Sequence, residues 1–200
     1  MGPIEAMWGM LIIVFTLVGL VRGFLKELGV LTVLIVALFG LDLAIPRLEN
    51  LINGGVLGSI GIAPLNPPVA GTHSTELLLW FTFSVLIVLV VFVSYQGETL
   101  SFEGTPPGFP VKTLLSALVG FVNGYLITGS LWWILNRYHY PPGPNIIDPD
   151  FLTPFAQSII NNKLLPFDLL GNGGTIPEAG LGTIWLPLIL VALIVLKVLR

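Results

Sequence analysis

The side chains that could do chemistry in this apolar chain are few, and three of them share one turn. The stretch VGLVRGFLKELG, residues 18–29, places Arg22, Lys26 and Glu27 close together inside an otherwise apolar run. Opposite charges at this spacing could form a functional pair that gates a passage at one membrane face. Charges at the ends of membrane helices more often reach to water and fix topology. We interpret Arg22, Lys26 and Glu27 as a charged turn.

Asp42 is an ionisable residue that falls inside a predicted membrane span. A carboxylate in lipid costs free energy, so an intramembrane carboxylate suggests a proton or ion pathway. Asp42 lies near the outer end of its predicted helix and precedes Arg47. The membrane interface or that arginine could therefore satisfy it. A proton or ion role and an interfacial position both remain open for this residue.

Other candidate sites are weak. His73 and His139 fall in predicted loops, and a metal site joining His139 to Asp148 and Asp150 lacks the usual ligand spacing. The chain has no cysteine, which excludes disulfides, thiolate nucleophiles and cysteine-ligated metals. It also lacks a phosphate-binding loop, a nucleotide fingerprint and a plausible Ser-His-Asp arrangement. We predict no catalytic residue, no metal and no cofactor.

The composition is that of an integral membrane protein. Of the 200 residues, 54% are hydrophobic and 10% are charged, whereas soluble domains carry about 25% charged residues. The apolar runs do not alternate with polar residues, so helices are favoured over a barrel. The net charge of -3, without a basic cluster, argues against nucleic acid as a partner. Membrane lipids are the expected surroundings.

The length of the apolar runs predicts one all-α transmembrane domain over residues 1–200. A single helix over residues 6–40 would be about 50 Å long, which exceeds the hydrocarbon thickness of about 30 Å. The chain must therefore reverse at the charged turn, where Gly23 supplies backbone freedom. We predict five spans, at residues 4–21, 28–45, 77–95, 114–135 and 183–198, with outer loops at 46–76 and 136–182.

The distribution of lysine and arginine predicts the orientation of the chain. Short segments on one side carry Arg22, Lys26, Lys112, Lys197 and Arg200. Positive charges in short loops face the cytoplasm, so we expect the N-terminus outside and the C-terminus in the cytoplasm.

Part of the second outer loop has helical periodicity. Apolar residues recur at helical spacing between Phe151 and Leu165, with asparagine and glutamine at other positions. This pattern predicts an amphipathic helix on the outer surface, between the fourth and fifth spans.

Small residues form strips on two of the predicted spans. Gly19 and Gly23 lie four residues apart on the first span, and Ala117, Gly120 and Gly124 form an equivalent strip on the fourth. Small residues at this spacing allow helix backbones to approach closely in a membrane. We predict that these two strips pack against each other.

Two related segments point to a family. VGLVRGFL, residues 18–25, is echoed by VGFVNGYL, residues 119–126. A helical hairpin with GLVRGFLKEL at its turn, followed by a helix opening LLSALVGFVNG, resembles the colicin V production protein (CvpA) family of bacterial membrane proteins over roughly residues 6–165. Asn123 stands where that family usually has an arginine. The resemblance implies a bacterial inner-membrane protein known by phenotype, including colicin V export and envelope traits, and not by a defined reaction.

Two functions are compatible with this sequence. The leading hypothesis is a non-catalytic auxiliary or scaffold subunit of the inner membrane, packed against other membrane proteins. The alternative is a small transporter or channel component that uses Asp42. A water-filled cavity around Asp42 would favour transport, whereas contact with headgroups or Arg47 would favour the scaffold.

Overall fold

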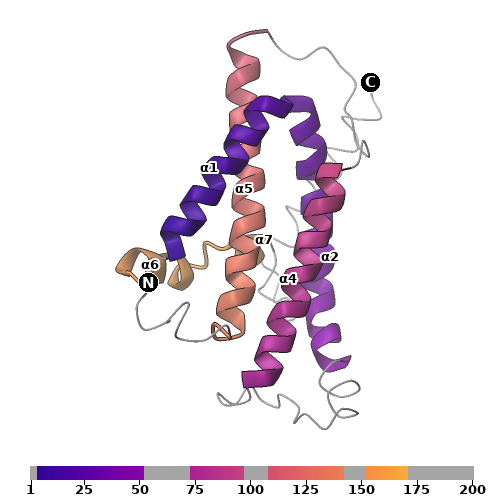
Figure 1. The fold of residues 1–200 in the computed structure, drawn as a ribbon, viewed down its shortest axis with the longest axis vertical. Helices are drawn as coiled ribbons and strands as arrows, with labels where there is room; N and C mark the ends of the chain where they lie inside the picture. Colours follow the sequence, from indigo (N-terminus) through magenta and orange to yellow (C-terminus); the bar gives the residue numbers. More distant parts are fainter. Residues whose placement is uncertain (1–3, 52–72, 97–107, 142–151, 171–200) are drawn as a thin grey trace.

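The computed structural model describes residues 4–51, 73–96, 108–141 and 152–170, and the regular structure in these ranges is helical (Figure 1). Among them, α1 (Ile4–Arg22), α2 (Phe24–Leu51), α4 (His73–Gln96) and α5 (Val111–Arg137) are long and apolar enough to cross a membrane. The predicted span at 183–198 lies outside the described residues, as does most of the predicted loop at 46–76. The shorter helices in these ranges are α6 (Pro154–Asn161) and α7 (Pro166–Leu170).

The turn between α1 and α2 is tighter than the sequence suggested. It consists of Gly23 alone, whose φ of 90° is one that residues with side chains rarely adopt. The α2 helix therefore begins at Phe24 and not at Leu28, and it runs through Pro46 to Leu51. Lys26 and Glu27 consequently belong to the first turn of a membrane helix, whereas we had predicted them to lie in a solvated loop.

The α5 helix is the centre of the bundle. It contacts α1, α2, α4 and α7, and Figure 1 shows it running beside α1 with α4 on its other side. Large side chains fill the interior, including Leu34 from α2, Phe83 from α4 and Ile134 from α5. Each of these is almost completely buried. The core thus joins helices that are far apart in the sequence.

The outward faces of the long helices are apolar. Met10 of α1 is 69% exposed, and Phe81 and Phe92 of α4 are 59% and 58% exposed. Such surface is unfavourable in water but is matched by the acyl chains of a bilayer. The α1 helix, with 19 residues, is about 28 Å long and fits a hydrocarbon core of about 30 Å. The chain is a multi-pass membrane protein.

The α6 helix lies beside the first residues of α1 (Figure 1). Thr153 caps it by accepting a hydrogen bond from the Ala156 amide at 3.3 Å, and the Thr153 hydroxyl also donates to Glu5. Ala156 and Ile159 are buried. The helix ends at Asn161 and does not extend to Leu165 as predicted, because Lys163 adopts a left-handed conformation with a φ of 53°. The membrane side on which α6 lies stays a prediction.

Polar contacts join the C-terminal ends of α2 and α5 to each other and to α7. Arg137 donates to both carboxylate oxygens of Glu49, at 2.9 and 3.1 Å, and the Tyr138 hydroxyl donates to Glu49 at 2.6 Å. Burial raises the pKa of Tyr138, and the nearby Glu49 charge raises it further, so the phenol remains a donor. Trp133 donates to Asp168 at 2.9 Å. These contacts hold α2, α5 and α7 together.

Candidate functional site: a buried carboxylate

The side chain of Glu27 is completely buried where the long helices meet. Its Oε2 accepts hydrogen bonds from Asn123 Nδ2 at 2.8 Å and from the Tyr95 hydroxyl at 3.2 Å. Asn123 Nδ2 also donates to the backbone carbonyl of Glu27 at 3.1 Å. One carboxylate of α2 is therefore bonded to α4 and α5.

Arg22, the last residue of α1, lies beside the same carboxylate. Its Nε is 3.6 Å from Oε1 of Glu27, which is an ion pair but too long for a hydrogen bond. Its Nη2 donates to the backbone carbonyl of Tyr95 at 3.3 Å, and the guanidinium lies 4.6 Å from the centre of the Tyr95 ring. We refer to Arg22, Glu27, Tyr95 and Asn123 as the Glu27 cluster.

The Glu27 cluster is only partly satisfied by the protein. Glu27 Oε1, Asn123 Oδ1 and Arg22 Nη1 are buried and have no hydrogen-bond partner among the described residues. A buried polar atom that lacks a partner costs free energy, and more when the group is charged. Unpartnered atoms on three members of one cluster distinguish it from an ordinary structural contact.

The crossing of α1 and α5 brings the members of the cluster together. A Cβ atom added to Gly19 would lie 2.7 Å from the Cα of Gly120 and 2.7 Å from the carbonyl of Ser116. A Cβ added to Gly120 would lie 2.9 Å from the Cα of Gly19 and 2.8 Å from the carbonyl of Phe15. The two backbones are therefore in direct contact, as small residues permit in membranes.

The contact between α1 and α5 joins equivalent positions of the two related sequence segments. When VGLVRGFL and VGFVNGYL are aligned, Gly19 matches Gly120 and Arg22 matches Asn123. The matched glycines touch each other, and the matched polar residues both face Glu27. The structure thus gives the sequence echo a physical meaning, because equivalent positions meet at one crossing and at one carboxylate.

The other predicted packing residues differ in their roles. Gly124 faces α1, since an added Cβ would lie 2.8 Å from the Cβ of Phe15. Ala117 is partly buried on α5. Gly23 is not part of the crossing as we had predicted, because no atom of another described helix lies within 4 Å of its added Cβ. Its role is the turn between α1 and α2.

Asp42 lies apart from the Glu27 cluster. The two residues are on the same helix, and their fifteen-residue separation corresponds to about 22 Å. Asp42 is partly exposed and has an interaction partner of its own. The residues described contain no group of three or more His, Cys, Asp or Glu side chains that could hold a metal. His139 instead lies 3.2 Å from Glu76, and the predicted partners Asp148 and Asp150 lie outside the described residues.

Two threonine hydroxyls inside the membrane-spanning helices are bonded within their own helices. Thr32 donates to the carbonyl of Leu28 at 2.9 Å, and Thr128 donates to that of Gly124 at 2.7 Å. Such back-bonding satisfies the hydroxyl locally. Neither contact extends a polar path from the Glu27 cluster.

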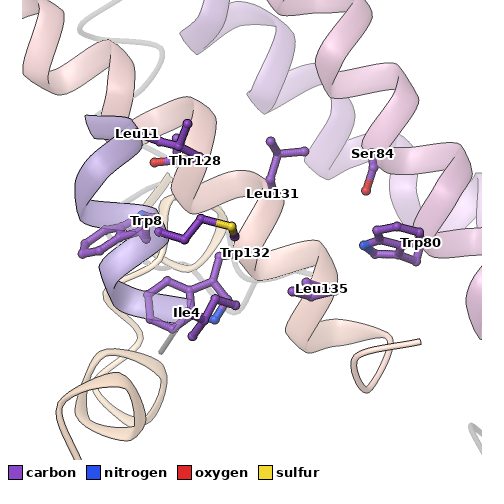
Figure 2. A pocket seen from close by; sticks show the side chains of 10 residues that line it. Ile4, Trp8, Leu11, Trp80, Ser84, Thr128, Leu131, Trp132 and Leu135 are labelled. Carbon is purple, nitrogen blue, oxygen red and sulfur yellow. The ribbon is translucent and has the colours of Figure 1, made fainter. Parts of the chain in front are cut away.

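A cavity of about 370 Å³ lies between α1, α4 and α5 (Figure 2). Figure 2 shows Trp8, Trp80 and Trp132 around it, one from each of these helices. Its lining is apolar apart from the Ser84 and Thr128 hydroxyls and the indole N–H groups of the tryptophans. The cavity therefore presents no charged side chain from the described residues to a polar substrate.

Glu27 is the residue whose role the sequence did not reveal. We had assigned it to a solvated turn, but it begins a buried stripe that continues through Val30, Leu34 and Leu38 of α2. These positions follow the spacing of an inward helix face. This stripe is the sequence signal that could have revealed the burial of Glu27. It could be recognised only if α2 were predicted to begin before Leu28.

Comparison with known proteins identifies a family. A family model described as Colicin V production protein matches residues 5–161, a range that extends from the second residue of α1 to the last residue of α6 and includes the entire Glu27 cluster. No curated protein and no solved structure matches the chain. The resemblance identified from the hairpin motif is confirmed, and the chain belongs to the colicin V production protein family.

Proposed function

We propose that this protein is a non-catalytic auxiliary or scaffold subunit of the bacterial inner membrane, whose outward helix faces pack against partner membrane proteins. The observation that carries this proposal is the large part of the α1 surface that no other described helix covers. That helix buries only Ile4, Ile12 and Gly19. Its opposite face remains available to a helix of another protein.

The chemistry of the α1 face suits a helical partner. Met10, Ile13 and Leu17 are 69%, 61% and 56% exposed, and they lie at spacings that place them along one side of the helix. Methionine adapts readily to different apolar neighbours. Packing of α1 on α5 through Gly19 leaves this side uncovered by the described helices.

Site-directed crosslinking tests whether this face meets a partner. A photoreactive amino acid at Leu17 is expected to form adducts with specific other membrane proteins in intact cells. The matched control is Leu34, which is 1% exposed and should form only intramolecular products. Adducts from Leu17 that contain lipid alone would contradict the proposed role of α1.

The proposed orientation places the N-terminus outside, and the absence of cysteine makes it testable by labelling. Lys26 and Ser158 are both exposed and lie near opposite ends of the bundle. A membrane-impermeant maleimide added to spheroplasts is expected to label Ser158→Cys, and to label Lys26→Cys only after the membrane is opened. Labelling of Ser158→Cys solely from the cytoplasm would reverse the topology.

A small transporter or channel component is the second candidate function. The buried carboxylate of Glu27, whose Oε1 has no hydrogen-bond donor among the described residues, favours it. This observation moves the candidate transport residue from Asp42 to Glu27. Proton or ion flux in liposomes that is lost in Glu27→Gln and kept in Asp42→Asn would support transport over the auxiliary role.

A further inference from the structure

We propose that the Glu27 cluster is a proton-binding site, in which Oε1 of Glu27 takes up a proton from the aqueous phase beside Arg22. In this step a new O–H bond forms at Oε1 with an electron pair of the carboxylate, and hydronium becomes water. Arg22 keeps its own charge, since guanidinium is not deprotonated in proteins. The net charge of the cluster rises from zero to plus one. This inference does not depend on the auxiliary role proposed above.

The hydrogen-bond pattern identifies the oxygen that binds the proton. Oε2 already accepts from Asn123 and Tyr95, whereas Oε1 has no hydrogen-bond donor among the described residues. A protonated carboxyl group retains acceptor capacity on its other oxygen. Both bonds to Oε2 therefore persist after protonation, and the connection of α2 to α4 and α5 is kept.

The Glu27 carboxylate is removed from water without a full set of partners among the described residues. An ionised carboxylate removed from water is unfavourable unless it is fully paired. Glu27 is completely buried, and the cationic group paired with it among the described residues is Arg22, whose Nε lies 3.6 Å away. Protonation removes the buried negative charge without requiring a new partner for Oε2.

Arg22 can lose the ion pair without losing all its contacts. Its side chain is 24% exposed, so it reaches the edge of the bundle. The guanidinium also donates to the Tyr95 carbonyl and lies over the Tyr95 ring. Exposure and these contacts accommodate the charge of Arg22 when Glu27 is neutral.

Within the described ranges, few charged or titratable groups face Glu27. Arg22 faces Glu27 from α1 and Tyr95 faces it from α4, while α5 contributes the neutral amide of Asn123. Lys26 precedes Glu27 on α2 but is exposed at the surface. Asp42 is remote along the same helix, and it therefore serves as a matched control carboxylate.

The test uses the full chain in lipid nanodiscs with 3-fluorotyrosine at position 95, because the Tyr95 hydroxyl donates directly to Glu27. Fluorine NMR is recorded from about pH 4 to about pH 9, a range that covers ordinary and strongly shifted carboxyl groups. We expect one titration of the Tyr95 signal, which is absent in Glu27→Gln and retained in Asp42→Asn. Infrared spectra should show a protonated carboxyl band that Glu27→Gln removes.

A second variant keeps the proposal testable if Glu27→Gln fails to fold. Replacing Arg22 by Gln removes the cation that favours the ionised carboxylate, so the midpoint of the Tyr95 titration should rise by about 1–3 pH units. No Tyr95 titration in the wild-type protein would overturn the proposal. A titration unchanged by Glu27→Gln, or a midpoint that does not rise in Arg22→Gln, would overturn it as well.

Discussion

Replacing Gly19 by alanine is expected to lower the free energy of unfolding by about 1–3 kcal/mol, the usual cost of overpacking. The added methyl group would meet the Gly120 Cα and the Ser116 carbonyl at 2.7 Å. Both are backbone atoms, so no side chain can rotate away and α1 and α5 must separate. Reversible unfolding in mixed detergent micelles, followed by circular dichroism, measures the change.

The matched control is Gly9→Ala on the same helix. Within the described structure no atom lies within 4 Å of a Cβ added at Gly9. Alanine also has the higher helix propensity, so this variant should equal or exceed the wild-type stability. Equal stabilities of Gly19→Ala and Gly9→Ala would show that the α1–α5 crossing is not close-packed at Gly19.

Replacing Asn123 by leucine is expected to destabilise the protein by about 1–3 kcal/mol, the cost of leaving a buried polar group without its partner. The change removes the donor that lies 2.8 Å from Oε2 of Glu27 and 3.1 Å from its backbone carbonyl. The Tyr95 hydroxyl at 3.2 Å would be the remaining donor to Oε2 among those identified. The same unfolding measurement applies.

A double-mutant cycle separates this effect from simple packing. Asn123→Leu should cost less in a Glu27→Gln background, because a neutral amide is less expensive to leave partly unsatisfied than a carboxylate. Asn161 is exposed on α6, and Asn161→Leu should therefore change the stability little. An identical cost of Asn123→Leu in both backgrounds would mean that the amide does not support the carboxylate.

The sequence predicted the helices better than it predicted their junctions. Long apolar runs gave the spans realised as α1, α2, α4 and α5, because membrane thickness sets a minimum helix length. The reversal at Gly23 was placed correctly but made too long. A single residue with a φ of 90° completes it, and nothing in the local pattern of charges distinguishes a one-residue turn from a short loop.

The Glu27 cluster could not be predicted in the same way. Tyr95 and Asn123 are separated from Glu27 by 68 and 96 residues, so their meeting depends on how the helices pack. The glycine strips indicated the α1–α5 contact, but not that its register would bring Arg22 and Asn123 to one carboxylate. Local sequence therefore identified the surfaces that pack, while the polar site arose from their tertiary arrangement.

Purification of the full chain from native membranes in mild detergent, with quantitative mass spectrometry, tests the central claim most directly. The auxiliary role predicts specific membrane proteins that co-purify at a constant ratio. Alanine at Ile13 and Leu17, on the exposed face of α1, should reduce their recovery, whereas alanine at the equally exposed Val88 of α4 should not. Recovery of a lone monomer that moves protons or ions in liposomes, with flux abolished by Glu27→Gln or Asp42→Asn, would contradict the auxiliary role.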